Sequence, residues 1–318
     1  MKSIQLAHGS GGLAMQQLID GLFMKAFANP WLAEQEDQAR LSLASLTAHG
    51  DRLAFSTDSY VIDPLFFPGG NIGKLAICGT ANDVAVSGAV PRYLSCGFII
   101  EEGLPMETLE AVVNSMAETA KAADIAIVTG DTKVVGRGAA DKLFINTAGM
   151  GAIPSDIHWG AATLTPGDLL IVSGTLGDHG ATILNLREQL GLDGELQSDC
   201  AVLTPLIQSL RPIAGVKALR DATRGGVNAV AHEFAATSGY GVEIHEQNIP
   251  LKDTVRGVCE LLGLDALNFA NEGKLMIGVT REAAEEVLAA LRAHPLGRDA
   301  AIIGEITERR GARVAGLY

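Results

Sequence analysis

The sequence predicts an α/β protein of two domains. Predicted strands and helices alternate in both halves of the chain, which is typical of α/β and α+β folds. The chain has 318 residues, which is too long for one ordinary hydrophobic core. A polar, turn-rich stretch, PSDIHWGAATLTPGD, separates the two halves. We therefore expect a glycine-rich loop and helix over 1–40, one domain over 41–155 and a second over 156–318.

Periodicity and helix-start signals place the elements of the first half. Apolar residues at helical spacing predict a helix that follows the glycine-rich loop. Small and apolar residues at steps of three and four predict a second helix over 73–89. Pro105 marks the first turn of a third helix. We expect the first strand to end at Asp58 and the third at Asp131, the strands being 52–57, 92–100, 125–130 and 143–153.

The second half repeats this alternation. Thr280 is the expected N-cap of its last helix, with Glu282 in the first turn. The expected order is strand 169–174, helices near 179–190 and 199–210, a strand, tight acidic turn and helix over 216–239, a strand and helix over 274–295, and strands near 300–308 and 312–317.

Composition and charge limit the classes of function. Hydrophobic residues make up 47% of the chain and charged residues 19%, which is a globular composition. The net charge of −13 argues against a general binder of nucleic acid or of anionic membranes. No stretch reaches the roughly 18 apolar residues of a membrane span, and the N-terminus lacks the apolar core of a signal peptide. We expect a soluble, cytoplasmic protein.

The cysteines are expected to be reduced thiols. None of them forms C-x-x-C, and no histidine lies at zinc-finger spacing. Buried free thiols therefore explain them better than a disulfide or a metal site does. The four positions are Cys78, Cys96, Cys200 and Cys259.

Four aspartates form the clearest candidate for a binding site. They are Asp58 in STDSYVIDP, Asp83 in the small-residue helix GTANDVAVSGAVP, Asp131 in TGDTKVV and Asp221 in RDATRGG. Each alone is more typical of a turn or a helix cap. Together they suggest a Mg²⁺ site, because carboxylates suit this ion and substrate phosphates usually complete its shell. Two carboxylates ~4 Å apart repel by about 4 kcal/mol, so their convergence would require a divalent cation.

The stretch HGSGGLA near the N-terminus suggests a phosphate-binding loop. Gly9, Gly11 and Gly12 leave backbone N–H groups accessible, and His8 stands beside them. The stretch also fits the looser dinucleotide form G-x-G-x-x-[GA], but it lacks a proper preceding strand, and the chain has no Walker-type P-loop. An ordinary mobile N-terminus is the alternative.

Three further stretches carry candidate groups for phosphate binding or catalysis. Arg224 and Gly225 follow the acidic turn, where a guanidinium and helix N–H groups can meet phosphate oxygens. Glu272 in NEGK precedes a strand beside Phe269, and a partly desolvated glutamate can act as a base. Lys133 in TGDTKVV can reach a phosphate. The plainer alternatives are a glycine-softened turn with surface arginines, and a solvated glutamate and lysine.

Five segments together resemble one superfamily of ATP-using enzymes, which contains aminoimidazole ribonucleotide synthetase, selenophosphate synthetase and thiamine monophosphate kinase. Within it they look like the HypE family of [NiFe]-hydrogenase maturation factors. The similarity runs from about residue 4 to the last residue, and only the motifs together make it specific. In order they are LAHGSGG, STDSYVIDPLFFPGGNIGKLAICGTANDVAVSGAVP, TGDTKVV, DATRGG and NEGK.

The resemblance implies a homodimer in which the mixed sheets of two N-terminal domains pair into a β-barrel with ATP at the interface. A C-terminal α/β sandwich follows. Asp58, Asp83 and Asp221 would hold Mg²⁺ and the phosphates, and Asp37 in EQEDQARLSL matches the family's first acidic position less clearly. The other expected nucleotide contacts are His8, Gly9, Gly11, Gly12, Asn82, Asp131, Thr132, Arg224 and Gly225.

The implied activity is a dehydration. A carbamoyltransferase partner places a carbamoyl group on the sulfur of a C-terminal cysteine. ATP phosphorylates the amide oxygen, and loss of phosphate leaves a thiocyanate. The cyanide then passes to the hydrogenase iron through a scaffold complex. Glu272 is the expected base, and Lys133 would steady the phosphate or the amide.

One departure from the family concerns the acceptor sulfur. Family members end in Pro-Arg-Ile-Cys, whereas this sequence ends in RVAGLY, and we expect the tail to have been removed or left out. The polypeptide as written should bind ATP without modifying itself. Two alternatives stay open: another small-molecule ATP enzyme of the superfamily, selenophosphate synthetase-like or kinase-like, and a non-catalytic maturation scaffold. No cysteine precedes Cys78, which counts against a selenophosphate synthetase.

Overall fold

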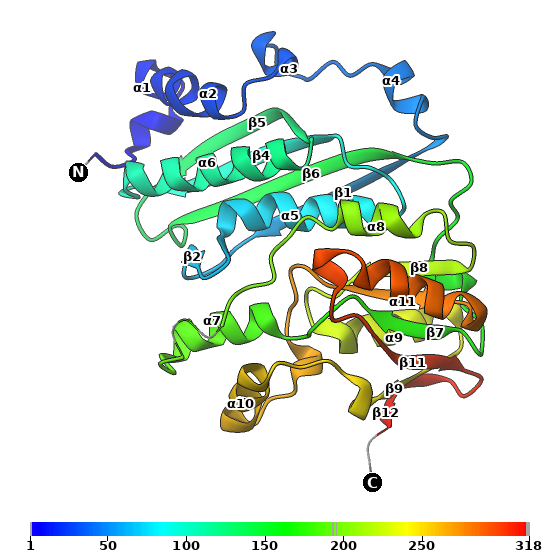
Figure 1. Ribbon diagram of the computed structural model, residues 1–318. Helices are drawn as coiled ribbons and strands as arrows, with labels where there is room; N and C mark the ends of the chain where they lie inside the picture. The colour runs from blue at the N-terminus through cyan, green and yellow to red at the C-terminus, as the bar shows by residue number, and fades with distance from the viewer. Residues whose placement is uncertain (1, 193, 195, 316–318) are drawn as a thin grey trace. The chain divides into compact units, whose positions relative to one another are not determined.

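The chain forms two compact units in the computed structural model, which describes residues 2–192, 194 and 196–315. The first unit comprises the residues up to Phe66, Gly70–Val84 and Ala89–Pro154. The second comprises Phe67–Gly69, Ala85–Gly88 and the residues from Ser155 onward. Each unit has a sheet of its own (Figure 1).

The first unit is built on a four-stranded mixed sheet in the order β1-β6-β4-β5. β1 (Arg52–Tyr60) runs antiparallel to β6 (Leu143–Ile153). β6 is also antiparallel to β4 (Tyr93–Glu101), which in turn lies parallel to β5 (Ala126–Val135). The short strands β2 (Phe66–Phe67) and β3 (Gly70–Asn71) pair with each other before the first long helix.

Helices cover one face of this sheet (Figure 1). α5 (Ile72–Ala85) and α6 (Met106–Ala122) pack on it, and the side chains that β4 directs towards them are buried. A Cβ at Gly73 of α5 would stand 2.5 Å from the carbonyl oxygen of Val112 on α6, so glycine lets the two helices approach closely. We call the other face the open face.

Short helices precede the sheet of the first unit. A 3₁₀ turn (Leu6–Gly9) is followed by one helical run, made of α1 (Leu13–Leu18), a π-helical turn (Ile19–Phe23) and α2 (Met24–Ala26). Phe23 of this run stacks on Phe98 of β4 with ring centroids 4.9 Å apart, on the helix-covered face. The remaining two short helices are α3 (Pro30–Ala33) and α4 (Leu43–Thr47).

The second unit contains a six-stranded sheet in the order β12-β9-β11-β7-β10-β8. Only the β12–β9 pair among these described strands is parallel. The strands are β7 (Leu169–Val172), β8 (Val216–Asp221), β9 (Gly241–His245), β10 (Leu275–Val279), β11 (Ala301–Thr307) and β12 (Gly311–Ala315).

Helices pack on both faces of the second sheet, which makes the unit an α/β sandwich. One apolar core joins the strands to α8 (Thr204–Leu210) and α11 (Ala284–Arg292). The other core lies on the opposite face under α9 (Gly226–Ser238) and includes the fully buried Phe234. Two further helices are α7 (Asp178–Glu188) and α10 (Asp253–Leu262).

The predicted α/β class and most elements are confirmed, but two strand ends are wrong. β1 continues through Asp58 and β5 continues through Asp131, because each strand stays paired with its neighbour beyond that residue. The helix expected over 199–210 begins only at Thr204. In the described part of the chain, none of the helices has the length and apolar character needed to cross a membrane.

Candidate functional site

Asp83 lies on α5 where this helix contacts β1. Its carboxylate Oδ2 accepts a hydrogen bond of 2.9 Å from the Ser56 hydroxyl. Asp58 is two residues further along β1, and alternate residues of a strand face the same side. Asp58 also accepts a hydrogen bond of 2.8 Å from the Ser59 N–H. The structure therefore brings Asp58 and Asp83, both half-buried, to the helix-covered face of the sheet.

A chain of hydroxyl groups fixes α5 on the sheet beside these aspartates. The Tyr60 hydroxyl lies 2.9 Å from Thr80 Oγ1, which lies 2.6 Å from Thr147 Oγ1. Thr147 in turn donates a 2.8 Å hydrogen bond to the carbonyl oxygen of Ala76. A Cβ at Gly79 would stand only 2.3 Å from the Tyr60 oxygen. The small residues of this helix thus allow its close packing against the strands.

Asn82 and Asp37 differ from the aspartate pair in exposure. Asn82 is 2% exposed and so lies inside the protein. Asp37 is exposed, in the irregular segment between α3 and α4. Their roles as nucleotide and metal ligands stay predictions.

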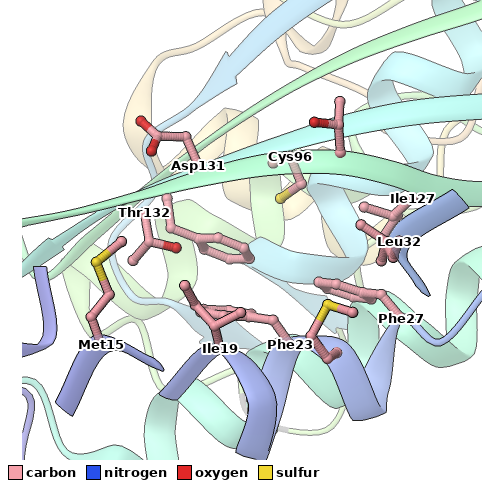
Figure 2. A pocket seen from close by; sticks show the side chains of 13 residues that line it. Met15, Ile19, Phe23, Phe27, Leu32, Cys96, Ile127, Asp131 and Thr132 are labelled. Carbon is pink, nitrogen blue, oxygen red and sulfur yellow. The ribbon is translucent and has the colours of Figure 1, made fainter. Parts of the chain in front are cut away.

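Asp131 and Lys133 lie on the open face of the sheet. Thr132, between them, is 6% exposed and pairs in register with Phe98 on the helix-covered face. Figure 2 shows Thr132 directed into the pocket under the N-terminal helices and Asp131 directed away from it. Lys133 Nζ lies 3.1 Å from Asp131 Oδ2. Within one chain, the sheet therefore separates this ion pair from the aspartate pair on the other face.

The pocket in Figure 2 lies between the N-terminal helices and the sheet. Its volume is about 160 Å³, and its lining is mainly apolar, with Phe23, Phe27 and Phe98 among the side chains. Cys96 also lines it, and burial raises the pKa of this thiol, which therefore stays protonated. A pocket of this character suits an apolar group better than a phosphate.

The glycine-rich loop lies against β5. A Cβ at Gly9 would stand 2.8 Å from the backbone nitrogen of Val134, so only glycine allows this approach. Gly11, with φ of +80°, and Gly12 lead from there into α1. The His8 ring accepts a 2.9 Å hydrogen bond from a backbone N–H of its own turn. The predicted phosphate loop thus lies beside the strand that carries the exposed ion pair.

The predicted acidic turn of the second unit also requires glycine at two positions. Asp221 is the last residue of β8, and the exposed Arg224 follows in the turn. Gly225 and Gly226 have φ of +74° and +60°, in the left-handed region. A Cβ at Gly226 would stand 2.4 Å from the carbonyl oxygen of Leu267. The turn therefore packs directly against the segment that leads to NEGK.

Asn271 joins the NEGK turn to the Asp221 turn. Its side chain is 1% exposed, accepts a 2.8 Å hydrogen bond from the Gly177 N–H and donates one of 2.8 Å to the carbonyl oxygen of Ala222. Its backbone N–H also donates to that oxygen, at 3.0 Å. Ala222 directly follows Asp221, and Glu272 directly follows Asn271. The second unit therefore holds Asp221 and Glu272 in one fixed arrangement.

Asp199 and Lys274 also contribute to this turn, and their roles were not predicted from the sequence. Asp199 Oδ1 accepts a 2.9 Å hydrogen bond from the Glu272 N–H, and its Oδ2 lies 3.1 Å from Lys274 Nζ. The partners lie 73 and 75 positions apart, so no local pattern could reveal them. Lys274 itself was the one sequence feature that pointed to such a contact, because a lysine directly before a buried strand needs an anionic partner.

The donor set fits a magnesium–nucleotide complex better than an all-protein metal centre. Over residues 2–192, 194 and 196–315, no three His, Cys, Asp or Glu side chains gather closely enough to hold a metal ion. Mg²⁺ usually takes one or two carboxylates together with substrate phosphates. Asp58 and Asp83 match that mode, and Asp221 belongs to the second unit.

The cysteines are free, as expected. Cys78, Cys96 and Cys200 are buried, whereas Cys259 is half-buried. Burial and the nearby charge of Asp265 raise the pKa of the Cys259 thiol. Burial thus limits the access of solvent to Cys78, Cys96 and Cys200.

The chain is similar to known proteins over its full length. Models described as AIR synthase related protein, N-terminal and C-terminal domain, match residues 35–153 and 165–316. Carbamoyl dehydratase HypE of Escherichia coli (strain K12) is 83% identical over 318 residues, which are 100% of this chain and 95% of that protein. A crystal structure of the hydrogenase maturation protein HypE in complex with ATP is 46% identical, with a TM-score of 0.93 over 98% of this chain and 94% of that one. A HypE–HypF complex is 43% identical, with a TM-score of 0.82 over 95% and 96%.

Proposed function

Because the chain belongs to the HypE family of carbamoyl dehydratases, we propose that it catalyses the ATP-dependent dehydration of a carbamoyl group. The observation that carries this proposal is the 83% identity over the whole chain to the relative from E. coli. The proposed substrate is an S-carboxamide on the cysteine of a C-terminal Pro-Arg-Ile-Cys segment. The proposed product is a thiocyanate, whose cyanide goes to the iron of a [NiFe]-hydrogenase.

In this reaction the S-carboxamide and ATP give the thiocyanate, ADP and inorganic phosphate. The amide oxygen attacks the γ-phosphorus and ADP leaves. The C–O bond to the phosphate then breaks while the nitrogen forms a triple bond to carbon. Two N–H protons must leave for this bond to form; Glu272 takes up one, and the released phosphate carries the other. Lys133, whose Nζ lies 3.1 Å from Asp131 Oδ2, steadies the transferred phosphate or the amide.

The nucleotide is assigned to the predicted glycine and aspartate positions. Mg²⁺, when bound, would neutralise phosphate charge during the transfer. Asp58, Asp83 and Asp221 are its proposed ligands. The half-buried Asp58 and Asp83 on one face of the sheet support this assignment. A relative that is 46% identical has been crystallised in complex with ATP, which supports ATP as the nucleotide.

A homodimer is the proposed assembly, with the open face of the first sheet as the contact surface. The open face exposes Leu53 and Phe55, at 52% and 65%, and Ile99 at 43%. Burying such side chains against a second copy is favourable. In this proposal the open faces of two copies pair, which places the Asp131–Lys133 pair of each copy at the contact.

Proteins of the same maturation process are the proposed partners. A relative has been crystallised as a HypE–HypF complex, which supports a carbamoyltransferase as the donor partner. Hydrogenase iron-site scaffold proteins are the proposed acceptors of the cyanide. The net charge of −13 argues against a nucleic-acid partner. We assign the reaction to the cytoplasm, with its partners.

A synthetic Pro-Arg-Ile-Cys peptide with an S-carboxamide tests the activity directly. With Mg²⁺ and ATP, the protein should convert it to the thiocyanate, seen by mass spectrometry as the loss of one water, with one phosphate released per peptide. Glu272→Gln should abolish the conversion, whereas the matched exposed variant Glu282→Gln should retain it. Phosphate release that is independent of the peptide, with no loss of water, would refute the proposal.

A further inference from the structure

Asp199 is a buried carboxylate with two assigned contacts. Its side chain is 4% exposed. Oδ1 accepts a 2.9 Å hydrogen bond from the backbone N–H of Glu272, and Oδ2 lies 3.1 Å from Lys274 Nζ. One carboxylate therefore holds two positions of the NEGK turn, on either side of Gly273. Burying a carboxylate in this way is costly unless both oxygens are satisfied, as they are here.

Glycines beside the Asp199–Lys274 ion pair leave space for it. The Lys274 side chain is 10% exposed, and a Cβ at Gly174 would stand 2.9 Å from its Cε. Glycine at position 174 therefore leaves room for the lysine stem. A Cβ at Gly273 would stand only 1.9 Å from the carbonyl oxygen of Asp199, so the turn and the Asp199 segment touch backbone to backbone.

From these contacts we infer that Asp199 is a positioning residue for Glu272, acting through the backbone N–H of Glu272 rather than through the substrate. This inference rests on the proposed role of Glu272 as the base. Asn271 fixes the turn on the side of Asp221, and Asp199 fixes the peptide unit of Glu272 itself. Without that contact the turn can rotate, and a base that moves by about 1 Å can lose two orders of magnitude in rate.

Two double variants separate positioning from folding. Asp199→Asn with Lys274→Met removes the ion pair but keeps an amide oxygen that accepts from the Glu272 N–H. Asp199→Leu with Lys274→Met removes the ion pair and that acceptor together. Neither leaves a buried unpaired charge, so both should fold. Thermal unfolding and the Kd for Mg²⁺ with a non-hydrolysable ATP analogue check folding and nucleotide binding in each.

The readout is kcat for dehydration of the S-carboxamide peptide. The Leu–Met variant should lose on the order of 10- to 100-fold in kcat, with its nucleotide Kd changed less than about threefold. The Asn–Met variant should rescue most of that loss. Equal kcat in the two folded variants would overturn the inference. Glu272→Gln, measured alongside, distinguishes the failures: full activity in that variant would remove the proposed base, and the inference with it.

Discussion

Replacing Asp83 with asparagine should abolish Mg²⁺-dependent turnover without unfolding the protein. The Asp83 carboxylate accepts a 2.9 Å hydrogen bond from Ser56, and an asparagine oxygen can accept the same bond. The free energy of unfolding should therefore change by no more than about 1 kcal/mol.

The effect on metal–nucleotide binding should be far larger. A unit charge ~4 Å from another contributes about 4 kcal/mol at an effective dielectric of 20. Even if phosphates cancel one of the two charges of Mg²⁺, the loss corresponds to a factor of about 10³ in affinity. Calorimetric titration with Mg²⁺ and a non-hydrolysable ATP analogue measures this factor, and phosphate release with the S-carboxamide peptide measures turnover.

The matched control for this variant is Asp124→Asn. Asp124 belongs to the same unit, is 89% exposed and pairs with Arg92 at 2.7 Å. The Asp124→Asn substitution should change nucleotide binding and turnover little, because exposed ion pairs contribute only roughly 0–1 kcal/mol to stability. Unchanged turnover in Asp83→Asn would refute the metal role of Asp83. A collapse of the unfolding midpoint would instead show that the carboxylate serves the fold.

Three further predictions concern stability and thiol chemistry. Gly73→Ala should destabilise the first unit by about 1–3 kcal/mol in urea unfolding, because its Cβ would meet the Val112 carbonyl oxygen. Burial lowers the pKa of His179, so below its unfolded pKa of about 6.5 the unfolded state binds a proton that the native state does not. The free energy of unfolding of the native sequence should therefore fall between pH 7 and pH 5, and it should fall less steeply in His179→Gln. Equal slopes in the two proteins would contradict this. A thiol reagent at neutral pH should modify the native protein only at Cys259, and slowly, as peptide mapping would show.

Local patterns predicted most of the fold because strands and helices leave periodic signals. Two strand ends were missed, since the pairing of β1 and β5 with their neighbours carries them past Asp58 and Asp131. The same pairing decides which face of the sheet each side chain occupies. No spacing rule reveals that Asp131 and Asp83 lie on opposite faces, because this depends on register and on the placement of α5.

The candidate site was only partly predictable for a related reason. Asp221 and Glu272 were predicted from motifs that lie on short turns. Asp199 was not, because its contact with Glu272 spans 73 positions and forms only in the folded unit. Asn271 lay within a quoted motif, but its role needs the Ala222 carbonyl, 49 positions away. Residues that act by positioning other residues are therefore hard to predict from a single sequence.

The most direct test of the proposed dehydratase adds a Pro-Arg-Ile-Cys segment to the chain through a flexible linker. The protein is incubated with the carbamoyltransferase partner, its carbamoyl donor and ATP, and then analysed by mass spectrometry of the intact protein and its peptides. We predict a carbamoyl adduct on the added cysteine that loses one water only when Mg²⁺ and ATP are present. An adduct on Cys78, Cys96, Cys200 or Cys259 instead, or one that never loses water, would contradict the account.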